Sequence, residues 1–172
     1  MCASLMLFLY RVYQFTLKAF VALYPFPKPD LYIGEQGLGD FVCALSAAKH
    51  KKILIVTDKV LKQLCVIEPI TDALNRNNHQ YVVFSDVEPN PTINNVESGL
   101  ECYLSQQCDA IIAIGGGSVI DCAKLIGARV VRPHKSLKQL KGLFKIVKKL
   151  PPLYAVPTTA GTGSETTVAA VV

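Results

Sequence analysis

Fifteen residues near the middle of the chain, AIIAIGGGSVIDCAK at 110–124, constrain its fold more than any other segment. The segment opens with a run of small and β-branched apolar residues, which is typical of a strand buried in a sheet. Three glycines follow at once, and apolar side chains then recur at helical spacing. A strand that passes through glycines directly into a helix is the repeating unit of parallel α/β sheets.

Strand-like runs alternate with helical periodicity over most of the chain. We predict strands within 31–33, 51–58, 80–85, 108–114 and 150–157. We predict helices at 41–50, 59–78, 92–107 and 118–130, and a short basic helix before the last strand. Pro69 should break or kink the second of these helices. The pattern predicts an α/β fold with a doubly wound, mostly parallel sheet, helices on both faces, and ligand sites at the carboxyl ends of the strands.

The first segment of the chain is apolar but differs in pattern. Within LMLFLYRVYQFTLKAFVALYPFP (5–27), the polar residues Arg11, Gln14 and Lys18 fall on one helical face. A spanning helix needs about 20 apolar residues, so we predict instead an amphipathic helix that ends at the following prolines. It could pack on the body of the protein, on a partner subunit, or on a membrane surface through residues 1–24. The small number of cations ranks the membrane behind the other two.

The proline-rich stretch after this helix marks a boundary. We assign residues 1–29 to the helix and its linker, and residues 30–172 to the α/β domain. The chain closes with the apolar run ETTVAAVV, which has no further element after it. This ending leads us to expect a fragment of a longer protein.

The net charge of +5 is unevenly distributed. Seven basic residues fall between Arg132 and Lys149, and no acidic residue lies between Asp121 and Glu165. Because this stretch lacks interleaved stacking aromatics, we interpret it as a solvated face and exclude nucleic acid as a partner.

The cysteines and histidines form no recognisable cluster. The six cysteines contain no C-x-x-C pair, and several lie in apolar runs, which indicates a reducing, cytoplasmic compartment. The three histidines are far apart in the sequence, so no metal site is predicted from spacing.

The three glycines raise the question of what approaches the backbone there. A helix N-terminus presents unpaired amides and a partial positive charge, so Gly116 and Gly117 would let a phosphate reach the main chain, with Ser118 as the N-cap of the helix. A pyrophosphate is the ligand that fits best. The P-loop pattern is absent, and Ile120 interrupts the usual dinucleotide fingerprint. A tight turn that binds nothing is the alternative.

Two aspartates have both a structural and a functional interpretation. Asp121 could complete a capping box with Ser118, or it could face the cleft and contact a ribose or nicotinamide. Asp58 ends the strand ILIVTD, where it could accept from the ribose hydroxyls of an adenosine and favour NAD over NADP. It could equally be a turn residue or the N-cap of the next helix.

A second loop, PTTAGTGSE at 157–165, also follows a strand. Thr158, Thr159 and Thr162 provide hydroxyls, and two nearby glycines free the backbone, which suits contacts with phosphate and ribose. Locally, Thr162 and Glu165 match a capping box. Two such loops at the strand ends of one sheet together predict a nucleotide site.

These motifs resemble those of the iron-containing (group III) alcohol dehydrogenases, a family that shares its fold with glycerol dehydrogenase and dehydroquinate synthase. The matching segments are VTDKVL at 56–61, VEPNPTINNVESGL at 87–100, CDAIIAIGGGSVIDCAKLIG at 108–127 and LPPLYAVPTTAGTGSETT at 150–167. The resemblance implies a Rossmann-like N-terminal domain of the dehydroquinate synthase type that binds NAD(P).

The resemblance also implies roles for individual residues. Gly116, Gly117 and Ser118 would contact the pyrophosphate, and Asp121 would lie by the nicotinamide end. The hydroxyls of the second loop would line the path of the phosphates and ribose, Asp58 would bind the adenine ribose, and Asn90 would lie near the adenosine. The residues of the second loop whose hydroxyls would line this path are Thr158, Thr159 and Thr162.

Family members hold iron, or sometimes another divalent metal such as zinc, in a C-terminal helical domain that would follow the end of this chain. We therefore assign no metal ligand and no catalytic residue. The resemblance implies the cofactor-binding half of an NAD-dependent, metal-dependent alcohol dehydrogenase that acts on a small alcohol or aldehyde, inactive alone, with homo-oligomers frequent among relatives. Alternatives are a non-catalytic nucleotide-binding or interaction module, and another oxidoreductase such as a glycerol dehydrogenase-like enzyme.

Overall fold

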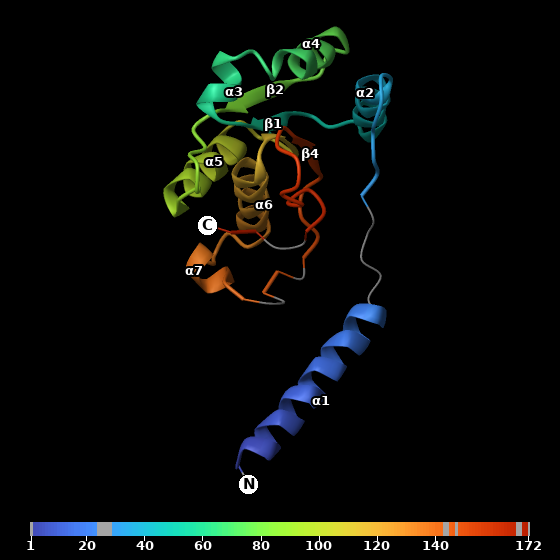
Figure 1. The fold of residues 1–172 in the computed structure, drawn as a ribbon. Coiled ribbons are helices and arrows are strands. Elements are labelled where there is room, and N and C mark those ends of the chain that lie inside the picture. Colours follow the sequence, from blue (N-terminus) through green and yellow to red (C-terminus); the bar gives the residue numbers. More distant parts are fainter. Residues whose placement is uncertain (1, 24–28, 143–144, 147, 168–169, 172) are drawn as a thin grey trace. The chain divides into compact units, whose positions relative to one another are not determined.

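The computed structural model describes residues 2–23, 29–142, 145–146, 148–167 and 170–171. The chain divides into two units, Met1–Leu31 and Tyr32–Val172 (Figure 1). Because the position of one unit relative to the other is not determined, each is described by itself.

The first unit contains the helix α1, Cys2–Leu23. The predicted N-terminal helix is thus confirmed, with Arg11, Gln14 and Lys18 at helical spacing along it. Large apolar side chains such as Phe8 and Phe15 are exposed on it. No helix in the described part of the chain combines the length and hydropathy that crossing a bilayer requires. Two of the prolines expected to end the helix, at positions 25 and 27, lie outside the described residues.

The second unit is built on a four-stranded sheet in which every pair of neighbours is parallel. The strands are β1 (Ile53–Val56), β2 (Tyr81–Phe84), β3 (Ala110–Gly115) and β4 (Leu153–Pro157). Their order in the sheet is β2-β1-β3-β4. The prediction of a strand within 31–33 is wrong. These residues have no regular structure and pair with no strand in the described part of the chain, and their apolar side chains are exposed.

Six helices connect and cover the strands in the described part of this unit. They are α2 (Gly37–Ala48), α3 (Lys59–Gln63), α4 (Glu68–Arg76), α5 (Ile93–Ser105), α6 (Gly117–Val131) and α7 (Leu137–Leu140). The break expected near Pro69 divides the predicted long helix into α3 and α4. Pro69 lies in the first turn of α4, where its missing N–H has no helical partner to lose.

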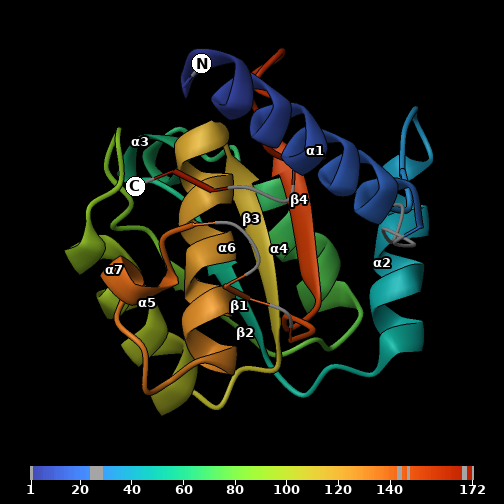
Figure 2. The same ribbon diagram turned by 90° about the horizontal axis from the view of Figure 1, so that it is seen from below.

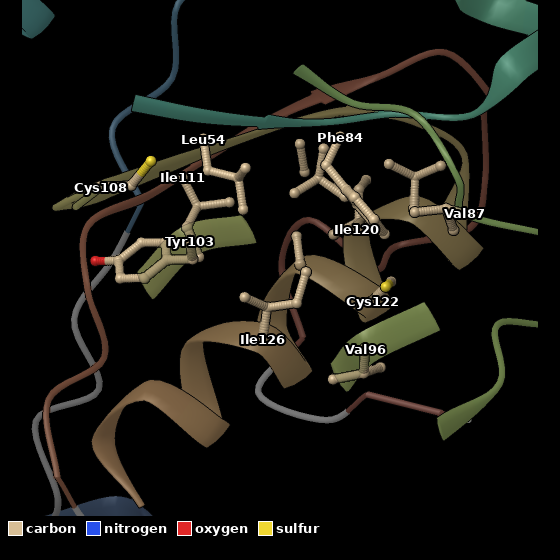
Figure 3. Close-up of a cluster of buried hydrophobic side chains, with 14 of the residues drawn as sticks. Leu54, Phe84, Val87, Val96, Tyr103, Cys108, Ile111, Ile120, Cys122 and Ile126 are labelled. Atoms are coloured by element: carbon tan, nitrogen blue, oxygen red, sulfur yellow. The ribbon is translucent and has the colours of Figure 1, made fainter. Parts of the chain in front are cut away.

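The sheet is covered on both faces, which confirms the doubly wound α/β class (Figures 1 and 2). Side chains alternate along each strand, so Leu54 and Val56 belong to one buried cluster while Ile53 and Ile55 belong to the other. The first cluster packs against α5 and α6, and Figure 3 shows strand side chains facing those of α6 such as Ile120. The second packs against α2 and α4.

The order of the strands creates a switch point between β1 and β3. From β1 the chain passes through α3 and α4 to β2 on one side. It then returns through α5, which lies on the opposite face of the sheet, and enters β3 on the other side of β1. In open parallel sheets, ligands bind at the carboxyl ends of the two strands from which the connections diverge in this way.

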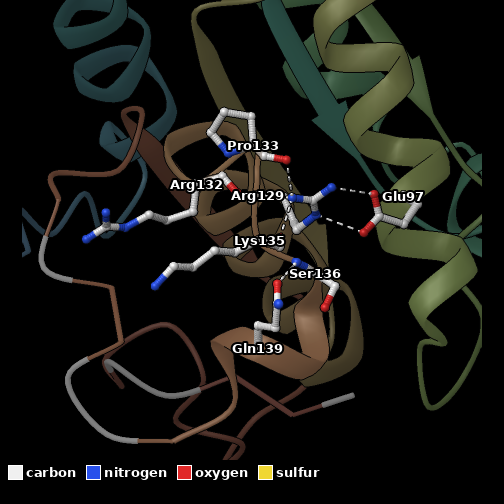
Figure 4. Close-up of polar contacts among 7 residues, drawn as sticks. All are labelled: Glu97, Arg129, Arg132, Pro133, Lys135, Ser136 and Gln139. Carbon is white, nitrogen blue, oxygen red and sulfur yellow. Dashed lines mark hydrogen bonds and ion pairs between the residues drawn. The ribbon is translucent and has the colours of Figure 1, made fainter.

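A polar cluster joins the end of α6 to α5 (Figure 4). The Arg129 guanidinium donates to both carboxylate oxygens of Glu97, at 2.8 and 3.1 Å. Its remaining nitrogen, Nη1, donates to the carbonyls of Arg132, Pro133 and Lys135. Arg129 therefore ties the chain that leaves α6 to α5, because one side chain binds both.

Candidate functional site

The turn from β3 into α6 contains the three glycines. Gly115 is the last residue of β3, Gly116 is the N-cap, and α6 begins at Gly117. The prediction that Ser118 is the N-cap is therefore wrong. Ser118 lies inside the first turn, and its Oγ accepts a hydrogen bond from the backbone N–H of Asn90 at 3.4 Å. Because Gly116 has no side chain to cap α6, the N-cap residue provides no acceptor to the first amides of this 15-residue helix.

The side chains nearest to Gly116 and Gly117 come from the loop that follows β4. A Cβ on Gly116 would lie 2.9 Å from the Thr159 Oγ1, and a Cβ on Gly117 would lie 3.1 Å from the Ser164 Oγ. A side chain at either position would require the hydroxyl opposite it to move, because a loop of the same chain packs closely against the turn. This contact brings hydroxyls from the second motif next to the N-terminus of α6.

The two loops leave the same edge of the sheet. Gly115 and Pro157 are register partners, and the Thr158 N–H donates to the Gly115 carbonyl at 3.1 Å. In the second loop, Gly161 and Gly163 have positive φ angles of 83° and 65°, which favour glycine.

The capping box expected at Thr162 and Glu165 is wrong. Residues 164–166 form a turn, and the described residues of this loop contain no helix that such a box could begin. The Thr166 N–H instead donates to the carbonyl of Gly163.

A small pocket lies where the two loops meet. Its volume is about 180 Å³, and it is lined by Asn90, Pro91, Gly117, Ser118, Asp121, Ser164 and Val171. Four of the nine residues predicted for the site line it: Asn90, Gly117, Ser118 and Asp121. The pocket is smaller than the 300–1,000 Å³ typical of a site that encloses a whole drug-sized ligand. It can hold only part of a dinucleotide.

Asp121 is held by partners on two sides. Its Oδ2 accepts from the backbone N–H of Val171 at 3.1 Å, and its Oδ1 lies 3.5 Å from the Lys124 Nζ. The capping box expected between Ser118 and Asp121 does not form, because α6 begins earlier than predicted and Asp121 lies beyond its first turn. Both Asp121 and Lys124 are largely buried, with side-chain exposures of 14% and 12%. Burial lowers the pKa of Lys124, and the charge of Asp121 opposes that shift.

Asp58 follows β1, across the switch point from the glycine turn. Its Oδ1 accepts from the Leu61 N–H at 2.8 Å, so it is the N-cap of α3. Asp58 therefore has the structural role that the sequence allowed, as a helix N-cap, and this role uses one of its two carboxylate oxygens. The adjoining Thr57 is fully buried, and its Oγ1 has no hydrogen-bond partner among the described residues.

The three-dimensional arrangement can now be compared with that of known proteins. The sequence model for iron-containing alcohol dehydrogenases matches residues 28–172.

The chain belongs to this family.

Relatives in the family have similar sequences and folds. Choline dehydrogenase of Bacillus subtilis is 38% identical over 136 residues, which are 78% of this chain and 33% of that protein. The solved alcohol dehydrogenase from Oenococcus oeni superposes with a TM-score of 0.75 at 34% identity, over 83% of this chain and 38% of the other. Sulfoacetaldehyde reductase from Bifidobacterium kashiwanohense, solved in complex with NAD+, gives 0.64 at 27% identity, over 84% and 38%. The present chain thus spans between a third and two fifths of the length of these relatives.

The described residues do not form a binding site for the iron after which the family is named. No group of three or more His, Cys, Asp or Glu side chains is arranged there to hold an ion. The residues present therefore do not fit a resident metal, and we derive no chemical step through one.

Sequence reasoning left out one lining residue that has a polar side chain. Ser164 contributes its hydroxyl opposite Gly117, and it belongs to the quoted PTTAGTGSE motif. The sequence contained an indication of this role, since Ser164 follows the three predicted threonines within the same motif and also carries a hydroxyl. By contrast, Val171 could not have been found from its residue type, because its contribution is a backbone N–H.

Proposed function

We propose that residues 30–172 form the nicotinamide dinucleotide-binding domain of an NAD-dependent, iron-containing alcohol dehydrogenase. The reaction of such an enzyme transfers a hydride between a small alcohol or aldehyde and the nicotinamide. One observation carries the proposal: two loops rich in glycine and hydroxyl groups leave adjacent strands beside the switch point and bound one pocket. Membership of the family supports it.

The diphosphate of the cofactor would bind at the N-terminus of α6. Because Gly116 and Gly117 carry no Cβ, the hydroxyls of Thr159 and Ser164 lie close to the main chain there, and a phosphate could bind these hydroxyls and the first amides of α6 together. The amides and dipole of a helix favour an anion at this position. The Ser118 hydroxyl lines the same pocket, and the Thr159 hydroxyl lies against the turn, so both can donate to phosphate oxygens. Thr158 and Thr162 would extend this path toward the ribose.

The remaining predicted residues would contact the two ends of the cofactor. Asp58 caps α3 through Oδ1, and its Oδ2 could accept from the hydroxyls of the adenine ribose. A carboxylate there would repel a 2′-phosphate, which favours NAD over NADP. Asn90 would lie near the adenosine, and Asp121 near the nicotinamide end.

The bound nicotinamide would supply the hydride chemistry, and this chain would hold and orient it. Because the described residues gather no metal ligand set, we propose that these 172 residues alone have little alcohol dehydrogenase activity. Robust, metal-dependent reduction of NAD+ by an alcohol with the purified chain would contradict this part of the proposal.

Cofactor binding is tested by titrating the full chain with NADH and following its fluorescence. We expect saturable binding, and we expect Gly117→Val to weaken it by at least about tenfold, because the added side chain would meet Ser164 and Thr162 and cover the amides. Gly39→Val in α2 is the matched control, since a Cβ there meets no described atom within 4 Å. Failure of the unaltered chain to bind NADH would overturn the proposed function.

A non-catalytic nucleotide-binding module is the second candidate. It rests on the observation that the described residues form a small pocket beside the N-terminus of α6 but gather no set of metal ligands. Calorimetry with NAD+ and an alcohol assay on the same sample distinguish the two functions. Binding without turnover when a metal is added would favour the module.

A further inference from the structure

The proposed site presents an electrostatic problem. Asp121 lines the same small pocket as Gly117 and Ser118, where the diphosphate of the cofactor would bind. A carboxylate and a diphosphate are both anions, and repulsion between them is strong where burial limits solvent screening. A site of this kind therefore needs a cation that compensates Asp121.

Lys124 is positioned to provide that cation. It lies one turn after Asp121 on α6, and its Nζ is 3.5 Å from the Asp121 Oδ1. The same Nζ donates to the Thr167 Oγ1 at 2.9 Å, which connects α6 to the chain that continues from the second loop. The negative charge of the Glu165 carboxylate also opposes the lowering of the Lys124 pKa by burial. The ammonium is thus held from α6 and from the loop, next to the pocket.

Burial distinguishes this ion pair from another on the same edge of the sheet. Asp121 and Lys124 are 14% and 12% exposed, whereas Lys59 and Asp86, 3.3 Å apart, are 72% and 61% exposed. An exposed pair is screened by water and contributes little. A pair with little exposure to solvent exerts a stronger field on its surroundings, so the loss of one partner would be felt in the pocket.

We propose that Lys124 is a positioning residue that cancels the charge of Asp121 and so allows the pocket to accept an anionic diphosphate. This inference rests on the proposed function. In this role Lys124 affects cofactor binding by compensating the charge of Asp121, and it does not contact the cofactor itself.

The test measures binding of ADP-ribose, which carries the diphosphate and adenosine without the nicotinamide, by calorimetry on the full chain. We expect Lys124→Met to raise the Kd about tenfold, as one uncompensated charge near the anion predicts. Adding Asp121→Asn to that variant removes the uncompensated carboxylate, so the double variant should bind within about threefold of the unaltered chain. Lys124→Arg should also keep its affinity, because it retains the charge.

Lys52→Met is the matched control. Lys52 is partly buried like Lys124, but it precedes β1 at the opposite edge of the sheet, where its Nζ donates to Gln106. We expect no change in the Kd for this variant. Circular dichroism of each variant reports whether it is folded. If Lys124→Met does not fold, Lys124→Arg and the double variant Lys124→Met/Asp121→Asn still test the proposal.

Three results would overturn the inference. If the unaltered chain binds NADH and Lys124→Met binds ADP-ribose equally well, the inference is wrong and the proposed function stands. If the double variant binds as weakly as Lys124→Met, or Lys124→Arg as weakly, Lys124 acts through packing and not through charge. If the unaltered chain binds neither NADH nor ADP-ribose, the proposed function fails and the inference fails with it.

Discussion

At the scale of the residue, each of the three adjacent glycines lies close to a different side chain. A Cβ on Gly115 would lie 2.6 Å from the side chain of Val119, in the first turn of the helix that follows. The other two glycines face the hydroxyls of Thr159 and Ser164. None of the three is among the glycines with positive φ, so the requirement at this turn is for space and not for backbone conformation.

The cysteines allow a prediction at the same scale. Burial raises the pKa of Cys122 to about 12 and that of Cys108 to about 11, whereas Cys43 and Cys65 are exposed. We predict that iodoacetamide alkylates Cys43 and Cys65 in the folded protein at pH 8, and Cys108 and Cys122 only after denaturation, because the thiolate is the reactive form. Mass spectrometry of the digested protein identifies the modified sites.

The pH dependence provides the check on this prediction. Glu68, through a hydrogen bond and its charge, raises the pKa of Cys65. The thiolate fraction of Cys65 at pH 8 is therefore lower than that of an ordinary thiol, and its alkylation should accelerate on going to higher pH. Rapid modification of Cys122 in the folded chain would contradict the assigned burial.

At the scale of the element, the end of α6 depends on a single side chain. Arg129 is 12% exposed, and it joins a carboxylate of α5 to three carbonyls of the chain that leaves α6. Only a guanidinium has enough donors in a planar fork to make these contacts at once. Arg129 thus adds a polar connection between the end of α6 and α5 to the apolar packing of the two helices.

We predict that Arg129→Met lowers the free energy of unfolding by about 2–3 kcal/mol, since it leaves several polar groups without a donor. Urea denaturation followed by circular dichroism measures the change. Arg76→Met, which removes an exposed arginine from the last turn of α4, is the control and should cost less than about 0.5 kcal/mol. Equal stability of the two variants would show that the Arg129 cluster contributes nothing.

Elements with a strong local pattern could be predicted from the sequence. The strands β1 and β3 are continuous apolar runs because both faces of the sheet are buried, and such runs are visible without any structure. The segment 31–33 has a similar composition but no neighbouring strand, so composition alone misassigned it. Gly116, and not Ser118, is the N-cap of α6, and the approach of Thr159 to Gly116 is a tertiary contact that no local pattern indicates. The Arg129 cluster joins residues that are distant in the sequence, and no local pattern indicates it.

At the scale of the whole molecule, both buried clusters are formed within the second unit. Their members, with the partly buried side chains packed against them, all lie between Phe41 and Val156. The α/β unit thus has the interior that a domain needs to fold independently.

We predict that deletion of residues 1–24 leaves the α/β unit folded. Its thermal unfolding should remain cooperative, with a midpoint within about 4 °C of that of the full chain, which corresponds to about 1–2 kcal/mol for a chain of this length. The helical signal in circular dichroism should fall by the contribution of α1. Loss of the cooperative transition on deletion would mean that the helix is part of the folded core.

The close approach of the second loop to the glycine turn also limits how this sequence can diverge. Position 116 lies against position 159, and position 117 lies against position 164. A methyl group gained on one side of either pair is tolerated only if the hydroxyl-bearing side chain opposite becomes smaller or moves away. Although a helix, a short basic segment and a strand separate the two motifs in the chain, we expect substitutions at these four positions to occur in matched pairs.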